Sequence, residues 1–294
     1  MNCLLCGSEK HHIFNRVSSF DVSLVYLQCE QCGFIFQSQE ENHEALQPGF
    51  YAETYRRVYQ GSVTPTGKDI WIQGQRAAHL IHLLDSTQPE RFKRMLDVGA
   101  SAGILLEAFQ RFYQSDVMGV EPGDAYRAFV KAKGLKMVTS LEEALEADTQ
   151  RFDLVTMIHV LEHLQNPIET LRVIREELLA ENGLLLLEVP NFYAHDSYEL
   201  AHLSCFTPHS VVEMVKQAGF QVTHCLQHGV PRSKLLNLYI TVMAEPLSEV
   251  VEVPEIRPDR HVRLKRRLGF LYRRFVQKLF PHRAWLSLPE EKLV

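Results

Sequence analysis

The chain has 294 residues, of which 46% are hydrophobic, and a formal net charge of −5. This length suits one large domain with attachments or two domains, and the hydrophobic share is ample for a buried core. No run of about 18 apolar residues is present, and the first residues lack a basic stretch followed by an apolar run, so we expect a cytoplasmic protein without a membrane-spanning helix or signal peptide.

Residues 1–45 contain two copies of a Cys-x-x-Cys-Gly motif, separated by a segment, 23–28, that is typical of a strand. A tight Cys-x-x-Cys turn directs two thiolates at one ion, and the following glycine relieves the backbone there. The spacing predicts a zinc ribbon in which one structural Zn²⁺ supplies folding energy and takes no part in catalysis. The predicted ligands are Cys3, Cys6, Cys29 and Cys32.

Residues 46–90 comprise a loop-like stretch and a helix. The loop is aromatic, with Phe50, Tyr51, Tyr55 and Tyr59, and we interpret it as a linker packed on the next domain, with a lid over a ligand as the alternative. From Asp69, a candidate N-cap, apolar residues recur at helical spacing as far as Leu84.

Residues 91–248 alternate short apolar strands with helical segments, which predicts an α/β domain with a doubly wound, mostly parallel sheet of seven strands. The last two strands are close in sequence, so we expect them to pair antiparallel at one edge. The predicted strands are 94–98, 117–121, 136–139, 153–158, 183–189, 220–225 and 236–243.

The first of these strands runs into a turn of small residues, and the second ends at Glu121. Small residues let a ligand approach the backbone closely, and a carboxylate at a strand tip can accept both hydroxyls of a ribose. A dinucleotide site needs Gly-x-Gly-x-x-Gly, but counting from Gly99 the later glycine positions hold Ser101 and Ile104. Asp97 would repel a pyrophosphate and attract an ammonium group. S-adenosylmethionine, which has an amino-acid end and no phosphate, fits this turn better.

The turn resembles the Asp-x-Gly-x-Gly-x-Gly loop of class I methyltransferases, with Ser101 in place of the middle glycine. The string His-Val-Leu-Glu-His-Leu-x-x-Pro from His159 to Pro167, continued by 184–191, resembles the corresponding motif of ubiquinone-biosynthesis O-methyltransferases. This resemblance implies a Rossmann-like fold and a pocket for S-adenosylmethionine. The implied cofactor-binding residues are Asp97, Gly99, Ala100, Ser101 and Gly103 at the methionine end, Glu121 at the ribose, Ser140 and Leu141 at the adenine, and His159 closing the pocket.

A hydroxyl acceptor needs a general base, and histidine suits that role near neutral pH. The candidate catalytic residues are His163, His195, His202 and His209. An alternative is a metal held by His159, Glu162 and His163 with His202 or His209, because the string is similar to one in metal-dependent 2′-O-methyltransferases of small RNAs.

Residues 249–294 comprise a linker and a basic amphipathic helix. Residues 257–283 carry a net charge of +9, so the rest of the chain carries −14 against the total of −5. Three hypotheses exist for the helix at 260–280. In the favoured one, its apolar stripe docks on the protein's own acidic body or on a partner; in the others, the helix lies on an anionic membrane or a lipid-linked substrate, or binds RNA. The stripe is Leu264, Leu268, Leu271, Phe275 and Leu279.

The residues together predict a methyltransferase that acts on a small-molecule or glycan acceptor, with O- or C-methylation unresolved. The order of ribbon and methyltransferase resembles that of sugar C-methyltransferases, which usually carry a further C-terminal α/β domain. Two alternatives remain. One is an RNA methyltransferase that uses the ribbon and the basic tail, and the other is a zinc-ribbon binding module whose cofactor fold is not catalytic.

Overall fold

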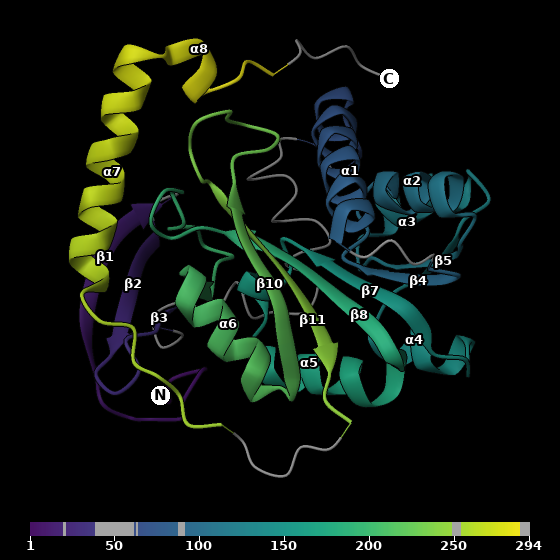
Figure 1. Ribbon diagram of the computed structural model, residues 1–294, viewed down its shortest axis with the longest axis horizontal. Helices are drawn as coiled ribbons and strands as arrows, with labels where there is room; N and C mark the ends of the chain where they lie inside the picture. Colours follow the sequence, from purple (N-terminus) through teal and green to yellow (C-terminus); the bar gives the residue numbers. More distant parts are fainter. Residues whose placement is uncertain (20–21, 39–61, 63, 88–91, 249–253, 289–294) are drawn as a thin grey trace.

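The computed structural model describes residues 1–19, 22–38, 62, 64–87, 92–248 and 254–288 (Figure 1). The aromatic stretch with Phe50, Tyr51, Tyr55 and Tyr59 lies outside the described residues. Among the helices that are described, none is both long enough and apolar enough to cross a bilayer.

The central sheet has seven strands in the order β10-β11-β8-β7-β4-β5-β6. The order reverses between β4 and β7, because the chain builds outward from β4 to β6 and then crosses back to β7. β11 runs antiparallel to both β8 and β10, which confirms the predicted antiparallel pairing at one edge. The strands are β4 (Arg94–Val98), β5 (Asp116–Val120), β6 (Lys136–Val138), β7 (Phe152–Ile158), β8 (Leu179–Pro190), β10 (Phe220–His228) and β11 (Tyr239–Pro246).

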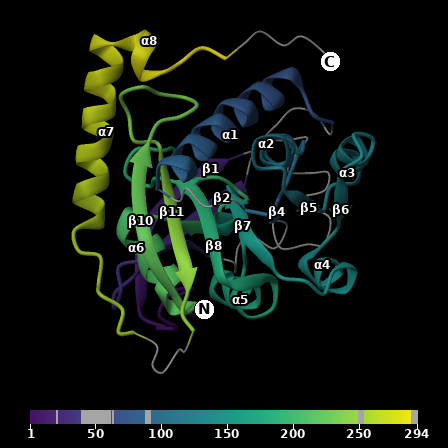
Figure 2. The same ribbon diagram turned by 45° about the vertical axis from the view of Figure 1, so that its right-hand side comes forward.

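Helices cover both faces of this sheet, as doubly wound folds require (Figures 1 and 2). Alternation along β4 shows the two layers: Met95 packs in the cluster with α1, α2 and α3, whereas Leu96 packs in the cluster with α4, α5 and α6. The helices are α1 (Gly67–Thr87), α2 (Ile104–Tyr113), α3 (Asp124–Lys131), α4 (Leu141–Ala147), α5 (Pro167–Val173) and α6 (Pro208–Gln217).

The N-terminal strands form a second, four-stranded sheet that includes a piece of the larger domain. Its order is β1-β2-β3-β9, and β9 (Ser204–Cys205) follows the β8 segment in sequence. Buried polar contacts strengthen this junction: the hydroxyl of Tyr26 and the amide of Gln37 both donate to the carbonyl of Glu199, at 2.9 and 3.1 Å. The N-terminal strands are β1 (His11–Ser19), β2 (Val22–Cys29) and β3 (Ile35–Gln37).

The C-terminal helix α7 (Val262–Leu279), followed by the short α8 (Pro281–Ala284), packs beside β1 and the segment after β8 (Figures 1 and 2). The expectation that its apolar stripe docks on the protein's own body is wrong. The side chains of the stripe are 51–60% exposed. Arginines dock the helix in their place, because guanidinium groups satisfy the bare carbonyls of the segment after β8.

Most predicted elements agree with the observed ones to within a few residues, but the predicted domain boundaries stay untested. They fall near residues 45, 90 and 248, and each lies within or beside a range outside the described residues. We keep 1–45, 46–90, 91–248 and 249–294 as the proposed division of the chain.

Candidate functional site

A cavity of about 470 Å³ opens at the carboxyl ends of β4, β5 and β7, where the strand order reverses. This is the place where open α/β sheets bind ligands. Seven of the predicted cofactor residues line it together with Val98, Val120, Pro122, Thr139, Glu142 and Ile158. The seven are Asp97, Gly99, Ala100, Ser101, Glu121, Leu141 and His159.

Asp97 lies at the end of β4 and is almost completely buried. Its Oδ1 accepts a hydrogen bond from the hydroxyl of Thr156 on β7, at 2.6 Å. Burial raises the pKa of Asp97 to about 7; the Thr156 bond opposes this rise, and the nearby charge of Glu121 adds to it. A carboxylate in this state favours a cation as its ligand, because a positive charge would offset the cost of burying the negative one.

Glu121 is buried at the tip of β5, and backbone groups hold both of its oxygens. The N–H of Ser101 donates to Oε2 at 2.9 Å, and the N–H of Gly123 donates to Oε1 at 2.8 Å. These bonds fix the carboxylate at the wall of the cavity, where its oxygens can act as acceptors for a ligand.

The turn between β4 and α2 depends on small residues for two different reasons. Gly99 has φ +78°, and a Cβ there would lie 2.4 Å from Cγ2 of Val160, in the loop after β7. Gly103 has φ +71° but does not line the cavity; a Cβ there would lie 2.7 Å from Val130 on α3. Glycine is therefore needed at Gly99 beside the cavity and at Gly103 for helix packing.

Of the two residues predicted at the adenine, only one lines the cavity. Leu141 lines the cavity, whereas the side chain of Ser140 caps α4 by accepting from the N–H of Glu143 at 3.3 Å. Thr139 and Glu142, which the sequence did not single out, line the cavity with Leu141.

His159 follows β7 with φ +56°, and two carboxylates hold its ring. Nε2 lies 3.0 Å from Glu188 and Nδ1 lies 3.3 Å from Glu162. Burial and the charge of Arg76 oppose protonation of His159, but the contacts with Glu162 and Glu188 outweigh them and raise its pKa. A positive φ in a histidine stores strain, and such strain is common beside ligand sites.

Glu188 and Arg76 are functional candidates that the sequence patterns did not indicate. Glu188 is fully buried, and Nε of Arg76 on α1 lies 2.6 Å from it. Burial opposes ionisation of Glu188, but Arg76 and hydrogen bonds from His159 and His228 hold its pKa well below the usual range. A single carboxylate within the apolar run of β8 was the available signal. Nothing in the amphipathic pattern of α1 distinguished Arg76, or Gln73, which also lines the cavity.

The four base candidates lie in different surroundings. His163 lines the cavity, and the ring of His202 lies 5.0 Å behind it. His195 is half-buried beside Tyr239, with 5.8 Å between the two ring centroids. His209 lies apart from them on α6, where its Nε2 is 2.6 Å from the carbonyl of Arg257.

Nδ1 of His163 lies 2.8 Å from the carbonyl oxygen of Ala201. A carbonyl only accepts, so we assign the ring proton to Nδ1 and the basic lone pair to Nε2. Burial lowers the pKa of His163 to about 4, against the opposing charge of Glu162. The ring is therefore neutral at pH 7.

The predicted metal alternative is only partly assembled. Ligand atoms of Glu162, His163 and His202 lie within 4.8 Å of one another, whereas His209 is not part of the group. Burial opposes ionisation of Glu162, but the surrounding imidazoles, His159 first, lower its pKa to about 2. The contact with His159 therefore already stabilises the charge of Glu162.

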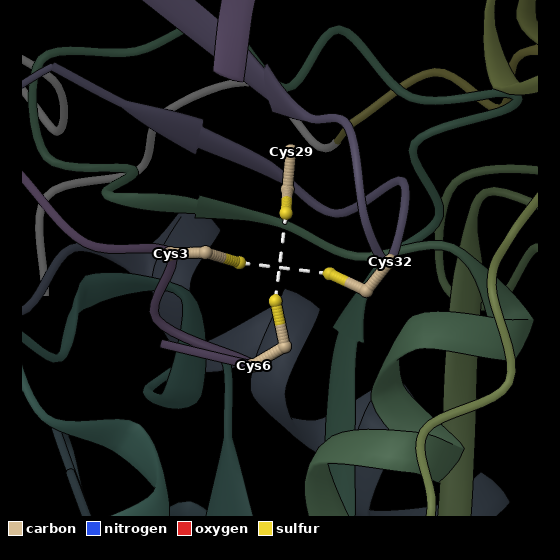
Figure 3. A group of neighbouring side chains, drawn as sticks. All are labelled: Cys3, Cys6, Cys29 and Cys32. Carbon is tan, nitrogen blue, oxygen red and sulfur yellow. Dashed lines mark hydrogen bonds between the residues drawn. The ribbon is translucent and has the colours of Figure 1, made fainter. Parts of the chain in front are cut away.

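The four cysteines of the N-terminal motifs converge on one point, as Figure 3 shows. Their sulfur atoms lie within 4.8 Å of one another, and the Cys3–Cys32 and Cys6–Cys29 pairs are 3.6 and 3.5 Å apart. Zinc–sulfur bonds of about 2.3 Å in a tetrahedron place the sulfurs about 3.8 Å apart, so the cluster fits a closed Zn²⁺ site. All six cysteines of the chain are free thiols.

The central part of the chain is similar to known proteins. A family model described as "Methyltransferase domain" matches residues 71–225. The ubiquinone biosynthesis O-methyltransferase of Hahella chejuensis is 37% identical to this chain over 82 residues, and that of Roseobacter denitrificans is 33% identical over 115 residues. These matches cover 26% and 36% of this chain, and 34% and 46% of the relatives. The chain thus spans less than half the length of these relatives.

Solved structures share the fold at low identity. A 1,6-didemethyltoxoflavin-N1-methyltransferase from Burkholderia thailandensis, described with bound S-adenosylhomocysteine, is 16% identical, with a TM-score of 0.54. That match covers 81% of this chain and all of the other. The PH0226 protein from Pyrococcus horikoshii is 15% identical, with a TM-score of 0.51, over 66% of this chain and 99% of the other. The likeness confirms the expected Rossmann-like sheet.

Proposed function

The chain belongs to the methyltransferase family whose domain model covers residues 71–225, and on that premise we propose that it methylates a small-molecule or glycan acceptor from S-adenosylmethionine. The cofactor supplies a methyl group on a sulfonium. The names of the curated relatives support a hydroxyl on a small molecule as the acceptor.

One observation carries this proposal: two buried carboxylates, Asp97 and Glu121, line one cavity from neighbouring strand ends. Asp97 would hold the ammonium of the amino-acid end, and Glu121 would accept the ribose hydroxyls. The backbone at Gly99 would approach the cofactor closely. A phosphate-bearing ligand does not suit this pair, because two buried carboxylates would repel it.

At the acceptor side we propose His163 as the group that removes a proton from a hydroxyl. Its ring lines the cavity and carries the basic lone pair on Nε2. Alignment of donor and acceptor supplies much of the rate of an in-line displacement, and the base adds the rest. His159, fixed by Glu162 and Glu188, would close the cavity and position the acceptor.

We propose that the cysteine cluster holds one structural zinc ion. Four sulfurs at near-tetrahedral spacing support this, and a closed Cys₄ site leaves no position open for substrate. RNA methylation has less support, because three of the basic side chains of α7, Arg263, Arg266 and Arg273, donate to main-chain carbonyls of the protein itself. Those arginines are therefore engaged and do not face a phosphate backbone.

The acceptor class is tested with methyl-labelled S-adenosylmethionine and three probes: a catechol-type phenol set, a set of nucleotide sugars, and mixed tRNA. We expect label in phenols or sugars. Label in tRNA alone would support the RNA alternative. Cofactor binding without label in any set would leave the non-catalytic module as the better account.

A further inference from the structure

The outer face of α7 is the largest group of exposed apolar side chains in the described part of the chain. Its stripe of Leu264, Leu268, Leu271, Phe275 and Leu279, with Tyr272, is 51–60% exposed. Of the other large exposed apolar side chains, Phe280 follows α7 directly, whereas Ile13, Phe112, Leu226 and Leu247 lie in separate parts of the chain. A contiguous exposed stripe of this kind marks an interaction surface.

The opposite face of α7 already has its partner. Arg273 donates to the carbonyl of Ala194 at 2.9 Å and to the carboxylate of Asp196 at 2.8 Å, and Arg266 donates to the carbonyl of Phe192. A Cβ at Gly269 would lie 2.0 Å from the carbonyl oxygen of Tyr193. The helix is therefore fixed by its inner face, and the orientation of the stripe follows from that docking.

Exposed cations border the stripe. Arg267, Arg274 and Lys278 recur at steps of seven and four, which places them in one row on a helix, and all three are exposed. Within the described part of the chain, none of these three side chains forms an ion pair or a hydrogen bond. Helix α7 contains no acidic residue at all.

We propose that α7 binds the surface of an anionic membrane, with the apolar stripe inserted among the lipids and the cation row on their headgroups. An apolar stripe beside a cationic row is the pattern of helices that lie in the plane of a membrane interface. Figures 1 and 2 show α7 at the periphery of the molecule, where a flat surface can reach it.

A second copy of the chain is a poorer occupant. The described surface offers no other large apolar patch to receive the stripe, so self-association would pair α7 with α7. That arrangement brings together two helices that carry only positive charges. An anionic lipid surface supplies the opposite charge along with the apolar environment.

The test is sedimentation of the full chain with vesicles of phosphatidylcholine, with and without phosphatidylglycerol. We expect binding to the anionic vesicles that weakens as salt is raised. The triple variant Arg267→Gln, Arg274→Gln, Lys278→Gln should bind about a hundredfold more weakly, at about 1 kcal/mol per cation. The triple variant Leu268→Gln, Leu271→Gln, Phe275→Gln should lose about a hundredfold as well.

Matched controls alter the same kinds of residue elsewhere: Lys10→Gln, Arg111→Gln, Lys131→Gln for charge, and Ile13→Gln, Phe112→Gln, Leu226→Gln for apolar surface. All are exposed, so the fold should tolerate them. Three results would overturn the proposal: wild-type protein that stays in the supernatant, control variants that lose as much binding, or a dimer in light scattering that the stripe variant dissociates. Vesicle binding needs neither cofactor nor acceptor, so its failure is separate from failure of the proposed function.

Discussion

At the scale of single residues, the site depends on buried carboxyl groups whose pKa values differ from their usual ones. Asp97 has a pKa near 7, whereas Glu162 and Glu188 are kept ionised by neighbouring cations and imidazoles. The difference arises from their partners. Among the described residues, only the Thr156 hydroxyl compensates the burial of Asp97, and the negative charge of Glu121 raises its pKa further. It is therefore the carboxylate that a bound ammonium would stabilise most.

This predicts a pH dependence for S-adenosylhomocysteine, which binds without reacting. The ionised form of Asp97 attracts the ammonium, and that form is lost as pH falls through about 7. Affinity should be greatest above pH 8 and should fall by up to about tenfold per pH unit below 7. Titration calorimetry from pH 8.5 to about 5.5 measures it. Asp97→Asn should bind weakly at every pH; a wild-type slope in this variant would show that another group titrates.

The variant His163→Asn tests whether His163 acts as a general base or has only a structural role. Asparagine can keep the donor to the carbonyl of Ala201 but has no basic nitrogen. With a hydroxyl acceptor we expect kcat to fall about a hundredfold or more, with cofactor affinity unchanged. Removal of Nε2 from a metal ligand would also release a bound ion, so metal content is measured alongside. A second metal per wild-type chain, lost in this variant, would contradict the base role.

At the scale of elements, the knuckle that carries Cys29 and Cys32 joins the ribbon to the C-terminal segment that leads into α7. The N–H of Asp259 donates to the carbonyl of Cys32 at 2.9 Å, and a Cβ at Gly33 would lie 2.1 Å from the carbonyl oxygen of Asp259. The segment before α7 thus packs directly on the knuckle. The absence of a side chain at Gly33 makes this approach possible.

Gly33→Ala should therefore destabilise the protein more than Gly7→Ala, its matched control in the first knuckle. Both glycines have positive φ, at +78° and +72°, so both variants carry a backbone cost of about 1–2 kcal/mol. Only Gly33 has a neighbour within 4 Å. We expect its free energy of unfolding to fall by about 2 kcal/mol more than that of Gly7→Ala in urea denaturation. Equal losses would mean that the Asp259 segment is not held there.

At the scale of the whole molecule, the segment 191–205 connects three parts of the protein. It carries His195 and His202, it supplies β9 to the ribbon sheet, and α7 binds its carbonyls from the other side. The N-terminal ribbon thereby connects to the cavity through Ala201, whose carbonyl oxygen lies 2.8 Å from Nδ1 of the cavity-lining His163, although no described cysteine lines the cavity itself.

Loss of zinc should therefore affect the acceptor more than the cofactor. Cys29→Ser with Cys32→Ser should remove about one zinc per chain, lower the melting temperature and raise KM for the acceptor, while S-adenosylhomocysteine affinity changes little. Cys225→Ser is the control, because this half-buried cysteine lies outside the cluster. An unchanged acceptor KM after zinc loss would contradict the supporting role of the ribbon.

Local patterns in the sequence predicted the parallel sheet, the knuckles and the turn at Asp97, because each depends on neighbours in the chain. Strand β4 was predicted at its observed bounds, Arg94–Val98. Features that join distant segments were missed: β9 in the ribbon sheet, the Arg76–Glu188 pair, and the outward orientation of the α7 stripe. The periodicity of α7 showed that two faces exist, but the bare carbonyls of residues 192–195 decide which face docks, and those become visible only in the fold.

The central claim is that Asp97 and Glu121 bind S-adenosylmethionine in one cavity, and titration calorimetry tests it most directly. The account predicts one cofactor per chain, with affinity about a hundredfold lower in Asp97→Ala and in Glu121→Ala, since each loses a charge-assisted contact of about 1.5–3 kcal/mol. Glu146→Gln, an exposed acid on α4, should bind as the wild type does. Wild-type affinity in both alanine variants would contradict the account.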